Sequence, residues 1–233
     1  MMNHQYRCIF IHIPKTGGKS VQRFFGTNWQ DHKDIARYAR ELEPHVFTKY
    51  YKFAVVRNPW DRLVSDYNYQ KKKGSQADHS LFIHDERGNK RSFNEWLEAV
   101  VSDPFCCEPT QWGAEVSQGI HRWSPQVDWI SINGKIAVDR VLRMENLQSD
   151  FAELGCILGL PSRELPCYNW RSHRHYSYYH NESTRRVVEK YYAKDIETFG
   201  YRFNSPSGIL RWGVPERLGI CLRSRLSRLV RAR

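Results

Sequence analysis

The sequence predicts an α/β fold: a three-layer sandwich with a central, mainly parallel sheet and a P-loop-like anion-binding loop. Short apolar runs rich in β-branched and aromatic residues alternate with segments of helical periodicity, the order typical of parallel sheets covered by helices. Turn residues directly follow two of these runs. The 233 residues, 40% of them hydrophobic, are enough for one substantial core. We expect ligands to bind at the carboxyl edge of this sheet.

The first half of the chain contains two strand–loop–helix units. The first strand is expected at 7–13, and turn residues follow it at 14–18. A helix is expected next, because apolar residues recur at helical spacing, namely Val21, Phe24 and Phe25. The second strand is expected at 53–56. The helix after it begins at Pro59, where a missing N–H costs nothing, and its apolar residues are Trp60, Leu63, Val64 and Tyr67.

The second half continues the alternation. Ser92 and Glu95 fit a capping box, so a helix is expected to follow them. Apolar patterning predicts three further elements, a strand at 138–142 and helices at 147–158 and 183–195. Two polar segments, 71–90 and 102–124, are interpreted as excursions from the core. The sequence shows neither an internal repeat nor a second hydrophobic core.

Composition excludes several classes of protein. No run of about 18 apolar residues is present, and the apolar segment near the N-terminus begins too early for a secretory signal, so we expect a cytoplasmic protein. The six cysteines form no CxxC pair, which favours free thiols in a reducing compartment over a zinc site or disulfides. They are Cys8, Cys106, Cys107, Cys156, Cys167 and Cys221. We expect no metal cofactor.

The positive charge is concentrated at the C-terminus. Residues 201–233 hold eight Arg and the single acid Glu216, which gives +7 of the total of +11 and leaves +4 for residues 1–200. Leucines recur at helical spacing between these arginines, at Leu218, Leu222, Leu226 and Leu229. We therefore divide the chain into a domain at 1–204 and a basic amphipathic tail at 205–233. The tail is expected to bind one of three partners: the inner face of a membrane through peripheral contact, a polyanion, or another protein. The alternative is that its leucines pack on the domain.

The segment 12–20, His-Ile-Pro-Lys-Thr-Gly-Gly-Lys-Ser, connects the first strand to the first helix. Such a loop directs backbone N–H groups and a helix N-terminus at one point, and its glycines let an anion approach the backbone. The Walker A pattern fits only in part: its second half would match Gly18-Lys19-Ser20, but Ile13 stands where its first glycine is required. Lys15, placed before the glycines, remains as the characteristic cation of a phosphate or sulfate site.

At these residues the chain resembles the PAPS-dependent sulfotransferases, in particular the carbohydrate branch with its heparan- and chondroitin-type and bacterial relatives. The resemblance rests on four segments, 13–18, 53–65, 143–147 and 195–201, and it spans roughly residues 7–203. It implies in-line transfer of a sulfuryl group from 3′-phosphoadenylyl sulfate (PAPS) to a hydroxyl group of a glycan. This transfer requires no metal ion. It therefore implies an enzyme whose partners are a glycan or another hydroxyl acceptor, and not nucleic acid.

The resemblance also implies roles for individual residues. Lys15 donates to the bridging oxygen of the donor. The 5′-phosphate is held by backbone N–H groups and one hydroxyl, those of Thr16, Gly17, Gly18, Lys19 and Ser20. Arg57 and Ser65 correspond to the motif for the 3′-phosphate, and their spacing of about two helical turns lets both reach one phosphate if the chain turns at Pro59. The ordinary alternatives are a surface salt bridge for Arg57 and a plain helix position for Ser65.

A late segment, 169–176, interleaves basic and aromatic residues. Single-stranded nucleic acids bind to such patterns, but in a sulfotransferase the same chemistry would bind the adenine and the 3′-phosphate. Arg171 and Arg174 are the candidates for this role. The glycines of the cytosolic sulfotransferases are missing here.

The catalytic base is expected to be His32, because a histidine titrates near neutral pH. Related glycan sulfotransferases carry a catalytic histidine between the two donor motifs, and Asp31 and Asp34 flank His32 closely enough to orient it. The alternatives are an exposed histidine at a helix start, a role for His45 instead, or a carboxylate such as Asp31 or Glu41.

Two other functions fit part of the pattern. A small-molecule kinase of the P-loop type would use the loop at 13–20 with Mg²⁺ and ATP. A non-enzymatic polyanion-binding module would use the basic tail and segment 169–176, but would leave Lys15 unexplained.

Overall fold

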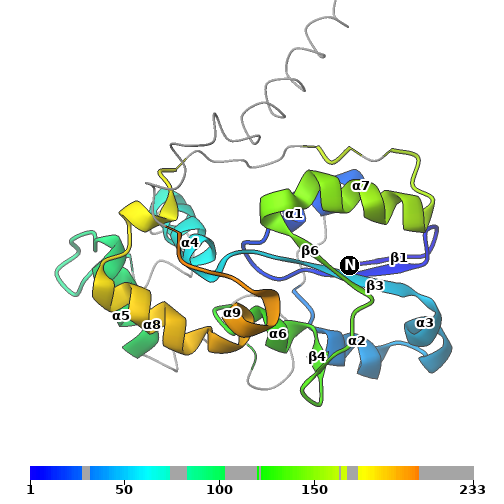
Figure 1. The fold of residues 1–233 in the computed structure, drawn as a ribbon, viewed down its shortest axis with the longest axis horizontal. Helices are drawn as coiled ribbons and strands as arrows, with labels where there is room; N and C mark the ends of the chain where they lie inside the picture. Colours follow the sequence, from blue (N-terminus) through cyan, green and yellow to red (C-terminus); the bar gives the residue numbers. More distant parts are fainter. Residues whose placement is uncertain are drawn as a thin grey trace, which may run out of the picture.

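The computed structural model describes residues 1–27, 32–73, 83–102, 120, 122–162, 164–166 and 173–204. Its central sheet has the strand order β1-β2-β3-β6. Strand β1 (Met2–Asn3) pairs antiparallel with β2 (Cys8–Ile11), whereas β2 pairs parallel with β3 (Tyr51–Val56), and β3 with β6 (Arg140–Arg143). The predicted α/β fold with a mainly parallel sheet is confirmed (Figure 1).

Helices cover both faces of the sheet (Figure 1). On one face α1 (Gly18–Phe24) and α7 (Leu147–Leu158) pack against Phe10, Phe53 and Val55. On the other face α2 (Ile35–Glu41), α6 (Gln126–Trp129) and α9 (Ala193–Phe199) join a second cluster with Ile11 and Val56. Because helices cover both faces and successive side chains point to opposite faces, β2 and most of β3 are buried on both sides and consist of apolar runs without polar alternation.

A group of helices extends the second cluster beyond the sheet. It consists of α4 (Pro59–Lys73), α5 (Phe93–Ser102) and α8 (Glu182–Tyr191), whose buried residues include Trp60, Trp96 and Val188. The remaining elements are short: α3 (Pro44–Lys49), the hairpin of β4 (Ser131–Ile132) with β5 (Lys135–Ile136), and two 3-10 turns, η3 (Met144–Asn146) and η4 (Tyr176–Tyr178). The sequence analysis did not predict these short elements.

Local capping signals are confirmed. Glu95 accepts a hydrogen bond from the Ser92 N–H at 2.7 Å, and Ser92 accepts one from the Glu95 N–H at 3.4 Å, so the predicted capping box is present. Helix α7 ends at Gly159 in the left-handed conformation, with φ of 62°. The strand predicted at 138–142 and the helix predicted at 147–158 correspond to β6 and α7.

The prediction of one continuous helix at 183–195 was wrong, because the segment forms α8 and α9 with a break at Tyr192. Tyr192 leaves the helical region, with φ of −102° and ψ of 25°. Its buried hydroxyl donates to the Trp123 carbonyl at 2.6 Å. Asp195 then accepts hydrogen bonds from the Gln126 and Val127 N–H groups at 2.8 and 2.9 Å. Long-range contacts therefore override the continuous apolar pattern.

The two segments predicted to lie outside the core, 71–90 and 102–124, are shorter than expected, because residues at their ends belong to a helix or to the core. Helix α4 extends to Lys73, and Ile83 is buried after the gap. Arg122, Trp123 and Ser124 are also buried, so the end of segment 102–124 belongs to the core. The rest of both segments, the tail at 205–233, and Cys106, Cys107, Cys167 and Cys221 lie outside the described residues.

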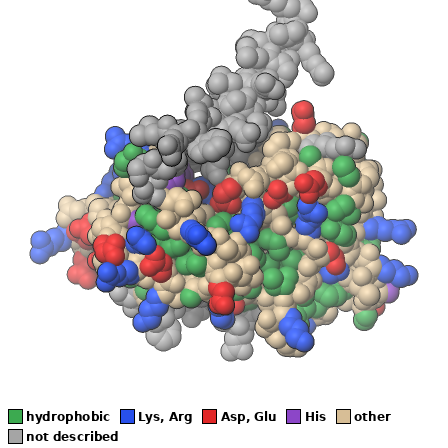
Figure 2. Space-filling view, viewed as in Figure 1, with side chains coloured by type: hydrophobic (Ala, Val, Ile, Leu, Met, Phe, Trp, Pro, Cys, Tyr) green, Lys and Arg blue, Asp and Glu red, His purple; other side chains and the backbone are tan. Residues whose placement is uncertain are grey.

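Cys8 is a buried free thiol and Cys156 an exposed one. In the described ranges no helix is long and apolar enough to cross a membrane. On the face shown in Figure 2, acidic and basic side chains are interspersed over the surface, in agreement with the small excess charge of residues 1–200.

Candidate active site

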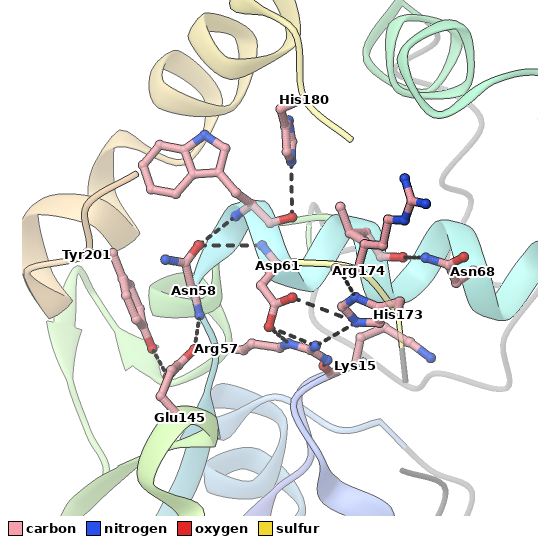
Figure 3. Close-up of polar contacts among 12 residues, drawn as sticks. Lys15, Arg57, Asn58, Asp61, Asn68, Glu145, His173, Arg174, His180 and Tyr201 are labelled. Atoms are coloured by element: carbon pink, nitrogen blue, oxygen red, sulfur yellow. Dashed lines mark hydrogen bonds and ion pairs between the residues drawn. The ribbon is translucent and has the colours of Figure 1, made fainter. Parts of the chain in front are cut away.

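Three chain segments meet at the carboxyl edge of the parallel sheet. Lys15 follows β2, Arg57 follows β3 and Glu145 follows β6. Because these strands are parallel and in register, their carboxyl ends share one edge. Arg57 Nη1 donates to the Lys15 carbonyl oxygen at 3.2 Å (Figure 3). The structure therefore brings together the two donor motifs that are 42 residues apart in the sequence.

The loop after β2 has the strand–turn–helix arrangement expected from the sequence. The Thr16 hydroxyl donates to the Ile13 carbonyl at 2.9 Å and closes the turn. Gly17, with φ of 87°, caps α1 without a side-chain hydrogen bond, and the first turn of α1 contains no acidic residue. Lys19 is exposed and Ser20 half-buried at the start of the same helix. Binding of an anion by this loop stays a prediction.

Packing requires glycine at position 18, and a φ of 87° favours it at position 17, which sequence reasoning missed. A Cβ at Gly18 would lie 2.0 Å from His12 Cδ2, and a Cβ at Gly17 would lie 2.5 Å from Met144 Sδ. The loop therefore rests directly on the His12 ring and on the Met144 side chain. No local sequence signal reveals the contact with Met144, because more than 120 residues separate the partners.

Arg57 is buried, with 7% of its surface exposed, and forms an ion pair with Asp61. Its Nε and Nη2 lie 2.9 and 2.8 Å from Asp61 Oδ2. Its backbone N–H donates to Gln126 Oε1 at 2.8 Å, and Gln126 Nε2 returns a bond to the Arg57 carbonyl. The ion pair is therefore internal rather than the surface salt bridge considered from the sequence. Ser65, half-buried, follows Asp61 by one turn of α4.

The late segment reaches the same place. His173 Nε2 lies 3.5 Å from Arg57 Nη2 and 3.8 Å from Asp61 Oδ1, and its Nδ1 donates to the Arg174 carbonyl at 2.8 Å (Figure 3). The Arg174 side chain is exposed beside it, and Arg171 lies outside the described residues. Sequence reasoning singled out this segment for its arginines but assigned no role to His173.

The turn after β3 is held by the other two family segments. Glu145 accepts from the Asn58 N–H at 2.7 Å and from the Tyr201 hydroxyl at 3.3 Å. Asn58 Oδ1 accepts from the Trp60 N–H at 3.1 Å, while Nδ2 donates to the Arg202 carbonyl at 3.3 Å. Burial raises the pKa of Tyr201, so its hydroxyl keeps its proton and donates to the carboxylate.

His32 packs against the back of the loop. Its Nδ1 lies 2.8 Å from the His12 carbonyl oxygen, and its ring centroid lies 4.2 Å from that of His12. Since a carbonyl only accepts, Nδ1 carries the proton and Nε2 is left with the lone pair. Burial lowers the pKa of His32 to about 4, assisted by the charges of Arg122 and Lys19. The neutral ring is therefore in the tautomer that a proton acceptor at Nε2 requires.

The alternatives to His32 occupy other places. His45 is exposed on α3, which leads into the amino end of β3, at the opposite edge of the sheet. Glu41 ends α2 and is paired with Lys33 and Arg37. Asp34, expected to orient His32, caps α2 by accepting from the Arg37 N–H at 2.9 Å. Asp31 lies outside the described residues.

Two buried arginines at the site were not singled out from the sequence. Arg62 donates to three carbonyl oxygens, those of Pro14, Ser124 and Arg122, at 3.1, 3.0 and 2.6 Å, and so connects the loop to segment 122–124. Arg122 pairs with Asp66 through two nitrogens, one of them Nε at 2.5 Å. The charge of Arg122 lowers the pKa of Asp66, although burial acts to raise it.

The fold and this basic edge define a mainly parallel α/β protein with cationic side chains gathered where its strands end. The chain belongs to the sulfotransferase family, whose model matches residues 1–202. The family-level resemblance found in the sequence is thereby confirmed, and membership supports sulfuryl transfer in general.

Among solved structures, the chain is similar to a sulfotransferase from Alicyclobacillus acidocaldarius, with 14% sequence identity over 81% of this chain and 92% of that chain, and a TM-score of 0.41. Comparison with curated protein sequences gave no match. Among the described residues, no group of three or more His, Cys, Asp or Glu side chains is arranged to hold a metal ion.

Proposed function

We propose that the protein transfers a sulfuryl group from PAPS to a hydroxyl group of a carbohydrate. One observation supports the proposal beyond family membership: Arg57 contacts the Lys15 carbonyl oxygen at 3.2 Å, so the two basic motifs are adjacent. A donor with an anionic group at each end requires two such motifs at a fixed separation. The carbohydrate acceptor rests on the resemblance in sequence alone.

The side chains present fit such a donor. Lys15, Lys19 and Ser20 supply a cationic and hydroxyl-bearing loop for the 5′-phosphosulfate. Arg57 and Ser65 supply the site for the 3′-phosphate. The guanidinium has five N–H donors, one more than its contacts with Asp61, the Lys15 carbonyl and His173 use within the described part of the chain. Asp61 therefore orients Arg57 and leaves a donor for a phosphate. Arg174, with Arg171, would approach from the late segment.

The donor supplies the sulfuryl group and leaves as a bisphosphate. Lys15 stabilises the negative charge that develops on the departing phosphate oxygen. His32 Nε2 accepts the proton of the acceptor hydroxyl, because hydrogen bonding to the His12 carbonyl keeps the proton of the neutral ring on Nδ1. A pKa of about 4 keeps this nitrogen available at neutral pH, at the cost of a smaller driving force for proton transfer.

Binding and turnover test the proposal together. Calorimetric titration with adenosine 3′,5′-bisphosphate should give a micromolar dissociation constant, which corresponds to a binding free energy of about −8 kcal/mol. Transfer of radiolabelled sulfate from PAPS should then be screened over glycans, lipids and small phenols in magnesium-free buffer. Absence of bisphosphate binding would refute the proposal. Magnesium-dependent ATP turnover would indicate the kinase instead.

The basic tail provides an internal control. A chain that ends at Asn204 should bind the bisphosphate as the full chain does, whereas a polyanion-binding module would lose its binding with the tail.

We also propose that the tail makes peripheral contact with anionic membranes. In sedimentation with phosphatidylserine vesicles, the full chain should be found in the pellet and the truncated chain in the supernatant. Equal amounts of both chains in the pellet would contradict the contact.

A further inference from the structure

Tyr69 occupies a particular position next to the candidate leaving-group lysine. The Lys15 ammonium lies 3.9 Å from the centroid of the Tyr69 ring, within the range of a strong cation–π contact. The Arg122 guanidinium carbon lies 5.8 Å from the centroid of the same ring. Tyr69 is half-buried on α4 and comes one helical turn after Ser65. Neither the sequence motifs nor the family match gives Tyr69 a role.

The backbone of Lys15 is also held in place. Its φ of 69° places Lys15 in the left-handed region, which is costly for a residue with a Cβ. Such a conformation persists only where surrounding contacts impose it. Here Arg57 holds the Lys15 carbonyl, and the Thr16 hydroxyl closes the turn onto Ile13. The ring contact fixes the far end of the side chain, so Lys15 is constrained at both ends.

Tyr69 is itself held by rigid surroundings. Asp66 and Gln70, its neighbours on α4, are buried, and Gln70 Nε2 donates to Asp66 Oδ2 at 3.2 Å. Asp66 fixes Arg122 in a buried ion pair and also accepts from the Trp123 indole at 2.8 Å. The ring therefore contacts both a fixed guanidinium and the ammonium of a side chain with many rotamers. Because the rotamer entropy of lysine is large, an unrestrained Lys15 side chain would sample many positions, and the ring contact restricts them.

We propose that Tyr69 is a positioning residue for Lys15: its ring face determines where the ammonium lies, and hence how often Lys15 reaches the leaving oxygen. The inference deepens the proposed function and rests on it for its effect on turnover. The contact itself does not depend on a donor, so it has a separate measurement.

The first test detects the contact directly. Reductive ¹³C-methylation keeps the charge of each lysine, and a methyl group above an aromatic ring resonates upfield. The Lys15 signal, assigned by its loss in Lys15→Ala, should lie upfield of the signal from exposed Lys49 on α3. Tyr69→Leu should move it to the position of exposed lysines, and Tyr69→Phe should keep it upfield. An unshifted Lys15 signal in the unaltered protein would overturn the proposal.

The second test measures turnover. Tyr69→Leu should lower kcat about tenfold and leave the bisphosphate dissociation constant within about twofold, while Tyr69→Phe should restore most of kcat. Tyr191→Leu, which removes a partly exposed tyrosine of α8, is the matched control for general effects. In the Lys15→Ala background, Tyr69→Leu should change kcat less than twofold, because its effect passes through Lys15. An undiminished tenfold loss there would overturn the proposal.

The two tests separate the possible failures. If the unaltered protein transfers no sulfuryl group, the proposed function fails, and the methyl signal still decides whether Tyr69 positions Lys15. If transfer is observed and the methyl signal of Lys15 is unaffected by Tyr69→Leu, the positioning role alone fails.

Discussion

At the scale of single residues, Lys15 and Arg57 are expected to act differently although they touch. The Lys15 ammonium contacts the Tyr69 ring, whereas the Arg57 guanidinium is buried and paired with Asp61. A residue that stabilises charge developing during the reaction affects kcat, and a residue that binds the donor equally throughout affects affinity. The variants of these two residues should therefore separate turnover from binding.

Lys15→Ala should lower kcat by roughly two to three orders of magnitude, the usual effect of losing one transition-state donor. The bisphosphate dissociation constant should rise much less. Steady-state kinetics and calorimetry measure the two quantities, and Lys49→Ala on the opposite edge of the sheet is the matched control. If Lys15→Ala changed affinity alone, Lys15 would be a binding residue and another group would have to stabilise the leaving oxygen.

Arg57→Ala should weaken bisphosphate binding by about 10- to 100-fold, because a charge-assisted hydrogen bond to a phosphate is lost. Turnover at saturating donor should change little. The variant also leaves Asp61 buried without its cation, so its thermal unfolding has to be measured alongside. Arg57→Lys keeps the charge and loses the planar fork, and should bind with intermediate affinity. Equal affinity of all three proteins would exclude Arg57 from the donor site.

His32→Ala should lower kcat by about two orders of magnitude with bisphosphate affinity nearly unchanged, because His32 is proposed to act on the acceptor. The pKa of about 4 sets the expected pH profile: protonation of Nε2 abolishes the base only as the pH falls toward 4. The acidic limb of kcat should therefore lie well below pH 6. His45→Ala serves as the control. Loss of activity in that variant, with His32→Ala active, would transfer the role to His45.

At the scale of elements, α4 connects the parts of the site. Asp61, Ser65 and Tyr69 recur every four residues and lie along one side of the helix, next to Arg57 and Lys15. In a second row, Arg62 bonds to the loop after β2 and to segment 122–124, Asp66 bonds to Arg122, and Gln70 donates to Asp66. Helix α4 therefore contacts both basic motifs, through Asp61 and through Arg62.

The second row of α4 predicts a large effect on stability. Asp66→Asn should destabilise the fold by about 3–5 kcal/mol, because Arg122 would remain buried without its counter-charge. Replacing both residues with apolar ones, as in Asp66→Leu with Arg122→Met, should cost less than the single change. Urea unfolding at neutral pH measures both. A double variant that is less stable than Asp66→Asn would contradict this account of the pair.

The sequence predicted what is local and missed what is long-range. Lys15 and Arg57 were found because each stands in a contiguous motif at the end of an apolar run. The break at Tyr192 was missed because its cause, the bond to the Trp123 carbonyl, joins residues 69 apart. The pairing of Asp66 with Arg122 spans 56 residues, and polar residues in an excursion give no sign of burial. The same holds for the contact of Gly17 with Met144.

At the scale of the whole molecule, one buried histidine, His12, and two half-buried ones, His32 and His180, should make the fold sensitive to acid. Burial lowers the pKa of His32 and of His180 to about 4, and lowers that of His12 well below its ordinary value of 6.5. Between pH 6.5 and 4 the unfolded chain therefore binds more protons than the folded one, and the free energy of unfolding falls as the pH falls. Asp195, whose pKa burial raises, offsets part of this loss near its own titration range.

Urea unfolding followed from pH 7.5 to pH 5 measures this dependence on the full chain. Below pH 6.5 each of these histidines should lower the free energy of unfolding by up to about 1.4 kcal/mol per pH unit. The midpoint urea concentration should therefore fall steeply as the pH falls. His32→Gln retains a hydrogen-bonding side chain and removes one titrating group, so its slope should be shallower by about one proton. In the folded protein these rings are neutral at pH 7: His32 Nδ1 donates to the His12 carbonyl oxygen, and His180 Nε2 donates to the Trp60 carbonyl oxygen. A midpoint independent of pH would mean that these rings are already protonated or exposed in the folded protein, and would remove the basis for a neutral His32 as the proton acceptor.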